Sequence, residues 1–571
     1  MEGTRAWCNR IIEGLIAAGV SDLVVSPGSR STPLLLAALQ SSLQLHSVVD
    51  ERSAAFFALG RTRKTGAPTA LLCTSGSAGA HYLPALLEAR YAGHRLIALT
   101  ADRPPQLRDC GANQTIDQRQ LFAAACPPCI ELGMPDSNGQ ALGAVRRRVC
   151  ESVSLATGPL HFNLAFRKPL EPESGEKGQR CEPFSPQPLR RPDLRAHQEA
   201  LRSIQHHCEK SKAIVIVAGP SEYGLADTEL LAAELTLLAK ATGAALLAES
   251  TSGARFVGKV HFHRIDSFTH VLNQDKATQE LTPDLILQVG LQPSSASLNR
   301  WLAQQTCTTV RMCDSVPYNS PDGSAQVVIG NLVDLCRRIR DLVAPPSDTA
   351  YIARWREWDE LARAAVETEI AETTSEFSEA QAMAAFLRQL PAACQITIGN
   401  SLAIRTADMV LSGSEKRLQF LHQRGTSGIE GLIAGAIGSS SESLSALILG
   451  DVSASHDSAS LALAALCQGP LTILCIDNDG GQIFSHLPVK TLELDASEWQ
   501  YWQTTPSVNW QALCQAYRVE YRMSACAEEF AESLHWASTQ EGCVFLHTKV
   551  AAEGLLQFQE NVATRIQRGP K

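Results

Sequence analysis

Two neighbouring stretches decide the fold: SALILGDVSASHD at residues 445–457 and LTILCIDNDGGQIF at residues 471–484. Each begins with a short apolar run and ends in a polar loop that contains glycine. Strands that are apolar throughout are typical of a parallel sheet covered by helices on both faces. Ligands of open parallel sheets bind at the carboxyl ends of the strands. The two loops therefore mark a predicted ligand-binding edge.

Oxygen-bearing groups in these loops suit a magnesium ion. Asp451 and Asn478 are 27 positions apart (478 − 451), which leaves room for one helix and one return strand. Mg²⁺ takes a near-octahedral shell of oxygen ligands, and the Asp451 carboxylate, the Asn478 amide oxygen and the Gly480 carbonyl would form half of it. Gly480 and Gly481 would let the backbone approach a diphosphate. Taken alone, a Gly-Asp pair after an apolar strand is equally consistent with a turn or a helix cap.

The same alternation of short apolar runs and longer helical patterns fills most of the chain, which predicts an α/β protein. Two stretches have the composition of linkers, residues 167–211 and 344–348. We therefore expect three doubly wound parallel-sheet domains over residues 1–185, 195–345 and 350–571. The predicted strands are Leu23–Val25, Ala70–Cys73, Leu96–Leu99, Ile214–Ala218, Leu285–Val289, Ile396–Ile398, Leu447–Leu449, Leu471–Ile476 and Cys543–His547.

Composition excludes several classes of function. A net charge of −9 over 571 residues gives no basic footprint for nucleic acid or for a membrane surface. No apolar run approaches the ~18 residues that a membrane helix needs, and the N-terminus has the spacing of an amphipathic helix. Seventeen cysteines are scattered, and the single CxxC motif, at Cys126 and Cys129, has no partner motif for zinc. We expect a protein of the reducing cytoplasm.

Further polar loops follow apolar runs in the N-terminal third. VVSPGSRSTPL places Ser29, Arg30 and Ser31 between a strand and a helix start, which is a natural anion site. Glu51 stands just before a helix of small, apolar residues, where it would ordinarily serve the helix dipole. A glycine-rich loop at residues 75–79 follows another strand, and Arg103 follows the next one.

Seven ordered motifs together resemble the 2-succinyl-5-enolpyruvyl-6-hydroxy-3-cyclohexene-1-carboxylate synthase (MenD) family of the menaquinone pathway. They cover both outer thirds of the chain, whereas the linker and the middle third match weakly. No single motif would suffice. The motifs are SPGSRSTPL (26–34), DER (50–52), TSGSAGA (74–80), LTADRPPQLRDCGANQ (99–114), GNSLAIR (399–405), QRGTSGIEG (423–431) and GDVSASHD with IDNDGGQIFSHLP (450–488).

The resemblance implies a thiamine-diphosphate enzyme. Its pyrimidine-binding domain would come first and its diphosphate-binding domain last, with a central domain between them. The active site would lie between subunits of a homodimer or homotetramer. The metal would be Mg²⁺, with Mn²⁺ as an alternative, held by Asp451, Asn478 and Gly480. The resemblance places cofactor contacts at Glu51, Ser75, Gly76, Ser401, Ile429, Gly450, Asp451, Asn478, Gly480, Gln482 and Ile483.

Glu51 is the implied catalytic residue, because its carboxyl group would exchange a proton with the aminopyrimidine ring. Ile429 would hold the cofactor in a bent conformation, although such a residue could equally be core. The implied substrates are 2-oxoglutarate and isochorismate, both dicarboxylates, which arginine binds through two parallel hydrogen bonds. The implied substrate residues are Ser29, Arg30, Arg103, Gln114, Ser401, Arg405, Arg424, Ile483, Phe484 and Leu487.

The chain departs from the family pattern in two places. A basic pair expected after residues 288–290 is replaced by Ala296 and Ser297. Either Arg300 would be a substitute, or the middle domain would contribute less to substrate binding. Asp477 and Asp479 replace residues that are often neutral, so they would add charge at the metal or face solvent. Two alternatives stay open: another thiamine-diphosphate enzyme, either a 2-oxoacid decarboxylase or an acetolactate-synthase-like carboligase, and a non-catalytic protein that kept the fold.

Overall fold

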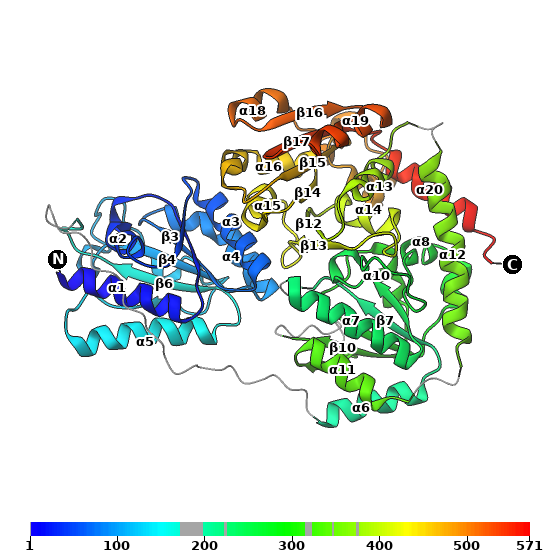
Figure 1. Ribbon diagram of the computed structural model, residues 1–571, viewed down its shortest axis with the longest axis horizontal. Helices are drawn as coiled ribbons and strands as arrows, with labels where there is room; N and C mark the ends of the chain where they lie inside the picture. The colour runs from blue at the N-terminus through cyan, green and yellow to red at the C-terminus, as the bar shows by residue number, and fades with distance from the viewer. Residues whose placement is uncertain are drawn as a thin grey trace. The chain divides into compact units, whose positions relative to one another are not determined.

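Three parallel sheets, each flanked by helices, make up the fold (Figure 1). The computed structural model describes residues 2–171, 198–221, 225–314, 323–344, 348–372 and 376–570. The predicted α/β class and all nine predicted strands are confirmed. By its internal contacts the chain forms two compact units, the first of residues 1–192 with 425–439 and the second of residues 193–424 with 440–571. The domain boundaries predicted from sequence stay a prediction.

The first unit is built on a six-stranded sheet in the order β2-β1-β3-β4-β6-β5. Alternate residues of its buried strands, such as Leu23 and Val25, face a core that also holds Ile11 and Leu15 of the first helix. This helix is the amphipathic one that the sequence predicts. The strands are β1 (Asp22–Val25), β2 (Gln44–Ser47), β3 (Thr69–Cys73), β4 (Leu96–Asp102), β5 (Ile130–Glu131) and β6 (Leu160–Ala165). The helices are α1 (Glu2–Ala17), α2 (Thr32–Ala38), α3 (Glu51–Thr65), α4 (Leu83–Ala92), α5 (Gly139–Leu155) and α15 (Leu432–Ser439).

Helix α15 packs closely on α3, although their first residues are 381 positions apart (432 − 51). A Cβ at Gly60 would lie 2.1 Å from the carbonyl oxygen of Gly435, and one at Gly438 would lie 2.1 Å from that of Phe57. Only glycine permits so close an approach of two helix backbones. The pairing therefore assigns the 425–439 segment to the first unit.

The second unit contains the other two sheets. The middle sheet has the order β11-β10-β9-β7-β8, and the C-terminal sheet has the order β13-β12-β14-β15-β17-β16. The strands are β7 (Ile214–Ala218), β8 (Ala245–Ala248), β9 (Leu285–Val289), β10 (Thr308–Cys313), β11 (Gln326–Ile329), β12 (Cys394–Ile398), β13 (Leu418–His422), β14 (Ser445–Gly450), β15 (Leu471–Asp477), β16 (Glu520–Ser524) and β17 (Cys543–Lys549). The helices are α6 (Gln198–Lys210), α7 (Leu225–Thr242), α8 (Phe268–Val271), α9 (Asp275–Glu280), α10 (Ala296–Ala303), α11 (Leu332–Leu342), α12 (Ala350–Ala371), α13 (Glu379–Gln389), α14 (Leu402–Val410), α16 (Asp451–His456), α17 (Ala496–Gln503), α18 (Trp510–Ala516), α19 (Ala527–Ala537) and α20 (Gly554–Ile566).

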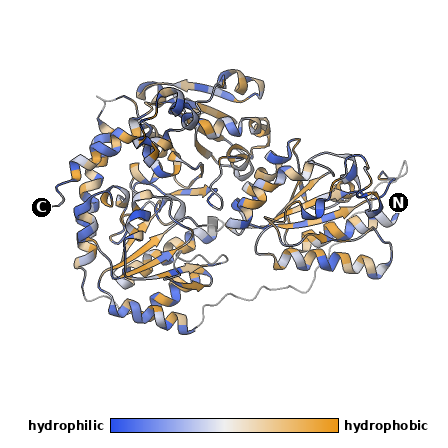
Figure 2. Cartoon of the chain, turned by 180° about the vertical axis from the view of Figure 1, so that it is seen from behind, coloured by the Kyte–Doolittle hydropathy of each residue, from blue (hydrophilic) through white to orange (hydrophobic). Residues whose placement is uncertain are grey.

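One hydrophobic core joins the middle and C-terminal sheets. It runs from Val215 and Ile286 of the middle sheet, through Trp301 and Trp355, to Ile396 of the C-terminal sheet. The two tryptophan rings meet edge to face with centroids 6.0 Å apart, an arrangement that aromatic pairs prefer. Figure 2 shows apolar strands inside and helices that are polar on their outer sides.

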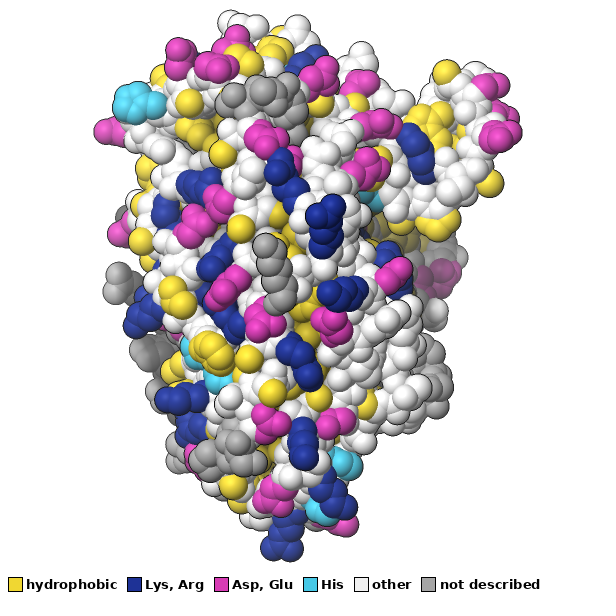
Figure 3. Space-filling view, turned by 90° about the vertical axis from the view of Figure 1, so that its right-hand side faces the viewer, with side chains coloured by type: hydrophobic (Ala, Val, Ile, Leu, Met, Phe, Trp, Pro, Cys, Tyr) yellow, Lys and Arg dark blue, Asp and Glu magenta, His cyan; other side chains and the backbone are white. Residues whose placement is uncertain are grey.

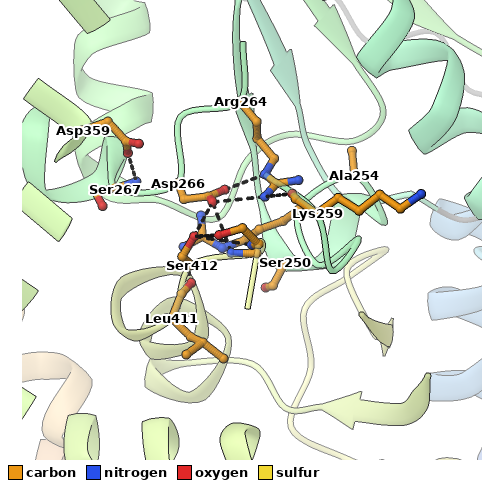
Figure 4. A network of polar contacts seen from close by, with 12 residues as sticks. Ser250, Ala254, Lys259, Arg264, Asp266, Ser267, Asp359, Leu411 and Ser412 are labelled. Atoms are coloured by element: carbon orange, nitrogen blue, oxygen red, sulfur yellow. Dashed lines mark hydrogen bonds and ion pairs between the residues drawn. The ribbon is translucent and has the colours of Figure 1, made fainter. Parts of the chain in front are cut away.

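A buried polar network reinforces this junction (Figure 4). Asp266 accepts hydrogen bonds from the Arg264 guanidinium at 2.8 Å and from the Ser412 hydroxyl at 2.8 Å, so it ties the loop after β8 to the loop after α14. Arg255 donates to the carbonyls of Asp408 and Leu411 at the end of α14. Loss of the Arg264 guanidinium would leave the buried Asp266 carboxylate without its ion-pair partner, which costs several kcal/mol.

The predicted linker over 167–211 is wrong in its last part, because residues 198–210 form α6. Leu201, Ile204 and Cys208 are buried against the middle sheet at helical spacing. Residues 172–197 and 345–347 lie outside the described part of the chain. No helix among the described residues is long and apolar enough to cross a membrane. Cationic and anionic side chains are interspersed on the face drawn in Figure 3.

Candidate active site

Both outer sheets reverse their strand order at one point, and several of the predicted site residues follow the strands on either side of it. In the C-terminal sheet the reversal falls between β12 and β14, which precede Ser401 and Asp451. In the first sheet it falls between β1 and β3, which precede Arg30 and Ser75. The crevice beyond the carboxyl ends of strands at such a point is where ligands of open α/β sheets bind. Each unit therefore carries one candidate half-site, which is named below after the part of the cofactor that the family resemblance assigns to it.

The diphosphate half-site, in the second unit, begins at Asp451. Gly450 ends β14 and pairs with Ile476 of β15, so Asp451 and Asn478 follow adjacent strands. One carboxylate oxygen of Asp451 accepts the Gly480 N–H at 2.8 Å, and the other accepts the N–H of the next residue, Val452, at 2.9 Å. The side chains of Asp451 and Asn478 are buried. The three residues of the predicted metal site thus lie together.

Gly480 stands where only glycine fits. Its φ of +108° is in the region that side chains avoid, and a Cβ there would lie 2.3 Å from the carbonyl oxygen of Gln503. Its own carbonyl accepts the Gln482 N–H at 2.8 Å and keeps a second lone pair for a metal. Gln503 and Thr505 donate to the Asp479 carbonyl, which fixes the loop. The backbone at Gly480 is therefore held in place for a close ligand.

The charges around Asp451 suit a cation. Burial, together with the nearby charge of Asp477, raises the pKa of Asp451 to about 7. A divalent cation would favour the ionised form, because it removes this penalty. Asp477 also forms a hydrogen bond with the His547 ring at 2.7 Å. Burial alone would raise its pKa, but the hydrogen bond from His547 holds it below its usual value. Asp479 is exposed.

Glu379, at the start of α13, is a neighbour of the predicted site that the sequence did not reveal. Its carboxylate accepts the Asn478 amide N–H at 3.0 Å and the Thr406 hydroxyl at 2.9 Å. Burial raises the pKa of Glu379 to about 7, against the effect of these two hydrogen bonds. Ser378 and Gln381 form the capping box of α13, so Glu379 is not needed as a cap. Its contact with Asn478 spans 99 positions and has no local signature.

Two predicted substrate arginines lie together in the same unit. Arg405 donates to the Ser401 carbonyl at 2.5 Å, and Arg424 donates to the Asn400 side chain at 3.0 Å. Burial and the neighbouring charge of Arg424 lower the pKa of Arg405, partly offset by Glu249 and Asp408. Ser401 has a φ of +64°, rare outside glycine and common at functional sites. Asn400 was not predicted.

The short helix after Gly481 carries the remaining predicted residues of this half. Gln482 is buried and accepts a hydrogen bond from the Ser485 hydroxyl at 3.1 Å. Ile483 is partly buried against the core of the unit, and Phe484 is also partly buried. Leu487 is 44% exposed and presents an apolar surface. These side chains could contact an apolar ring.

The pyrimidine half-site, in the first unit, contains Glu51 as the first residue of α3. Asp50, not Glu51, caps the helix, since its carboxylate accepts the Arg52 N–H at 2.9 Å and the Ser53 N–H at 3.4 Å. Burial and the nearby charge of Glu51 raise the pKa of Cys73 to about 12. Glu51 therefore lies near the end of β3.

A second pair of arginines lies in this unit. Arg30 is buried and donates to the Phe166 carbonyl at 2.8 Å; burial and the charge of Arg103 lower its pKa. Arg103 donates to the Ser75 hydroxyl, and Gln114 donates to the Ser75 carbonyl at 3.0 Å. Gly76 follows with a φ of +86°. Of the predicted residues around this pair, Ser29 is exposed at the surface.

Ile429 belongs to this unit as well, and a buried carboxylate anchors its segment. Glu88 accepts the backbone N–H groups of Gly425 at 3.0 Å and Thr426 at 2.6 Å. Glu88 also pairs with Arg63 at 2.8 Å. Ile429 itself is partly exposed. Sequence reasoning missed Glu88, which lies 337 positions before Gly425.

In the middle domain, one of the two positions where a basic pair was expected is buried and the other is exposed to solvent. Ala296 is exposed, whereas Ser297 is buried and donates to the Thr269 carbonyl at 3.0 Å. Arg300 is exposed on α10. The preceding Ser294 and Ser295 donate backbone N–H groups to Glu249.

Comparison with known proteins adds independent support. Residues 8–121 match the thiamine pyrophosphate enzyme N-terminal TPP binding domain, and residues 405–548 match the corresponding C-terminal TPP binding domain. A 2-succinyl-5-enolpyruvyl-6-hydroxy-3-cyclohexene-1-carboxylate synthase of Sorangium cellulosum is 37% identical over 509 residues, which cover 85% of this chain and 83% of that protein. The proteins of the same name from Geobacillus kaustophilus (36% over 490 residues, covering 84% and 83%) and Halorubrum lacusprofundi (31% over 615 residues, covering 98% and 97%) are also similar.

The cofactor of such a chain is thiamine diphosphate with a divalent metal. The residues at the diphosphate half-site fit that group, because a buried carboxylate, an amide and a glycine backbone supply oxygen ligands and room for phosphate. By sequence, by fold and by these relatives, the chain belongs to the 2-succinyl-5-enolpyruvyl-6-hydroxy-3-cyclohexene-1-carboxylate synthase family of thiamine-diphosphate-dependent transferases.

Proposed function

We propose that this chain decarboxylates 2-oxoglutarate and joins the remaining four-carbon unit to isochorismate by conjugate addition. The products would be CO₂ and 2-succinyl-5-enolpyruvyl-6-hydroxy-3-cyclohexene-1-carboxylate, made for menaquinone or phylloquinone. One observation carries the proposal: two arginines are neighbours in each unit, Arg30 with Arg103 and Arg405 with Arg424. Two adjacent cations favour an anionic partner, and dicarboxylate substrates supply one at each end.

The residues of the diphosphate half-site would hold the cofactor. Asp451, Asn478 and Gly480 would bind Mg²⁺ or Mn²⁺ through oxygen atoms, and the Gly450 backbone and Gln482 would contact the diphosphate. When bound, thiamine diphosphate supplies the electron sink that makes loss of CO₂ from a 2-oxoacid possible. Ser75, Gly76, Ile429 and Ile483 would contact the rest of the cofactor.

Glu51 would move the proton. Because Asp50 caps α3, the Glu51 carboxyl group is not needed at the helix end. It would exchange a proton with the aminopyrimidine ring of the cofactor and so prepare the cofactor for reaction. The position of Glu51 near Cys73 supports this role, since that thiol marks the carboxyl end of β3.

The arginine pairs would position the two substrates. Arg405 and Arg424, with Ser401, would bind one dicarboxylate. Arg30 and Arg103, with Ser29 and Gln114, would bind the other, while Phe484 and Leu487 would contact the apolar part of the ring. Guanidinium groups held by protein carbonyls, as in Arg30 and Arg405, are oriented before a substrate arrives, which lowers the entropic cost of binding.

We further propose a homo-oligomer in the cytoplasm. The half-site that contains Glu51 and the half-site that contains Asp451 would come from different subunits, as the family resemblance implies. Sedimentation at micromolar concentration would then give a mass of two or four chains. A monomer that turns over at an unchanged specific activity on dilution would contradict this arrangement.

The deciding experiment mixes the purified protein with thiamine diphosphate, Mg²⁺, 2-oxoglutarate and isochorismate. We expect the absorbance of isochorismate to fall only when all four are present. No loss of absorbance would refute the proposal. A faster release of CO₂ from pyruvate than from 2-oxoglutarate would instead favour an acetolactate-synthase-like enzyme or a different 2-oxoacid decarboxylase. The four arginines argue against a monocarboxylate substrate.

A further inference from the structure

An asparagine amide has an oxygen on one side and an N–H₂ group on the other, and only the oxygen binds a metal. Something must therefore set the rotation of the Asn478 side chain. We infer that Glu379 is a positioning residue that holds the Asn478 amide with its oxygen available to the metal. This inference rests on the metal site proposed above and adds a residue to it.

Hydrogen bonds on both oxygens fix the Glu379 carboxylate. One oxygen accepts the Asn478 amide N–H at 3.0 Å, and the other accepts the Thr406 hydroxyl at 2.9 Å. Glu379 is the first residue of α13, and Ser378 and Gln381 form a capping box at this N-terminus. The side chain of Glu379 is thus held between α13, α14 and the loop after β15, and it has little freedom to rotate.

The chemistry of the acceptor then decides the orientation of the amide. A carboxylate accepts hydrogen bonds, so it attracts the N–H₂ side of Asn478 and repels the oxygen side. The amide oxygen must therefore point away from Glu379. The rest of the loop lies against the proposed metal site, because the Gly480 N–H donates to Asp451 at 2.8 Å.

A purely structural role explains Glu379 less well. Its side chain is buried, and within the described ranges no lysine or arginine forms an ion pair with it. Burying a carboxylate without a cation costs free energy, and an apolar residue of the same size would join α13 to α14 at lower cost. The single proton of the Thr406 hydroxyl has another acceptor in the Leu402 carbonyl at 3.0 Å, so Asn478 is the group that needs Glu379.

Metal binding tests the inference directly. We would titrate the thiamine-diphosphate-loaded protein with Mn²⁺ and follow the free ion by electron paramagnetic resonance. Glu379→Met keeps the volume and removes the acceptor, and we expect it to weaken Mn²⁺ binding about 10- to 100-fold, as for other residues that orient metal ligands. Glu379→Gln keeps an oxygen for Asn478 and should bind Mn²⁺ within about threefold of the parent protein.

Thr406→Val is the matched control, because it removes the other hydrogen bond of Glu379 and leaves Asn478 untouched. It should bind Mn²⁺ like the parent. Equal weakening in Thr406→Val and Glu379→Met would overturn the inference, as would normal binding in Glu379→Met. If Glu379→Met does not fold, Glu379→Ala gives the same comparison. Parent protein that binds Mn²⁺ no better than Asn478→Ala would refute the proposed metal site itself, a distinct result.

Discussion

The Glu88 carboxylate holds Thr426 by two hydrogen bonds, one from the backbone N–H at 2.6 Å and one from the hydroxyl at 2.8 Å. These bonds connect residues 338 positions apart, and Glu88 also pairs with the buried Arg63. A segment from the last third of the chain is thereby fixed in the first unit, together with Ile429. The position of the predicted cofactor residue therefore depends on this buried carboxylate as well as on the packing of α15 on α3.

Glu88→Ala should therefore loosen the 425–439 segment. Removing one partner of a buried ion pair leaves the other charged and unpaired, so we expect a loss of about 3 kcal/mol in the stability of the first unit. Hydrogen exchange measured by mass spectrometry should rise in 425–439 and α3. As a control, Glu151→Ala breaks the exposed pair with Arg147 and should cost less than about 1 kcal/mol. Unchanged exchange in 425–439 would contradict the anchoring role.

Acid should have the same effect on the parent protein. Burial would raise the pKa of Glu88, but Arg63 and the groups of Gly425 and Thr426 outweigh it and hold the pKa below the ordinary 4.5. A carboxyl with a lowered pKa in the folded state stabilises above its unfolded pKa and loses that contribution as the pH falls through its folded pKa. Exchange of 425–439 should therefore rise below about pH 4.5, and less so in Glu88→Gln. An identical pH profile in both proteins would exclude Glu88 as the cause.

Glu51→Gln should slow turnover by orders of magnitude while the cofactor still binds. The amide keeps the shape of the side chain but cannot exchange the proton. Proton transfer by a positioned side chain typically contributes about 100- to 10,000-fold in rate. Turnover is measured by the loss of isochorismate, and cofactor binding by calorimetry. Asp50→Asn, which preserves the cap of α3, should stay within a few fold of the parent. Near-normal turnover in Glu51→Gln would remove Glu51 from the mechanism.

Arg405→Lys should raise the KM for 2-oxoglutarate by about 10- to 100-fold, because a lysine cannot bind a carboxylate through two parallel bonds. Arg417→Lys is a suitable control, since Arg417 is exposed and pairs with Glu229 at the surface. Steady-state kinetics with each substrate varied in turn would show which one each pair binds. A KM that changes for neither substrate would argue against Arg405 as a substrate residue.

Gly480→Ala should damage the loop of the proposed metal site. An added Cβ would lie 2.3 Å from the Gln503 carbonyl, at a φ that alanine avoids, so we expect a cost of about 1–3 kcal/mol and weaker Mn²⁺ binding. Gly542→Ala is the control, because nothing lies within 4 Å of a Cβ there. Thermal unfolding and Mn²⁺ titration measure both effects. Equal behaviour of the two variants would show that the Gly480 backbone is not constrained.

Local pattern predicted most of the strands and the arrangement of polar loops, because strand burial and strand-end position leave clear marks in the sequence. Helix α6 was missed because the Pro- and Arg-rich composition before it hid the spacing of Leu201, Ile204 and Cys208. Asp477 was expected to add charge or face solvent, and its charge does raise the pKa of Asp451; its contact with His547, 70 positions away, was not predicted. Glu88, Glu379 and Asn400 also act through distant partners, and such contacts leave no local trace.

The hydrophobic core that joins the middle and C-terminal sheets has a consequence for folding and for evolution. Elements that share one core unfold cooperatively, so the 193–424 and 440–571 segments should melt together and resist separation into independent pieces. A substitution around Trp301 would disturb the packing of the strand that leads to Asp451, because both belong to the same core. Residues of the middle sheet are thus constrained by the need to keep the loops at the other end of the same core in place, whether or not the middle sheet contacts a substrate.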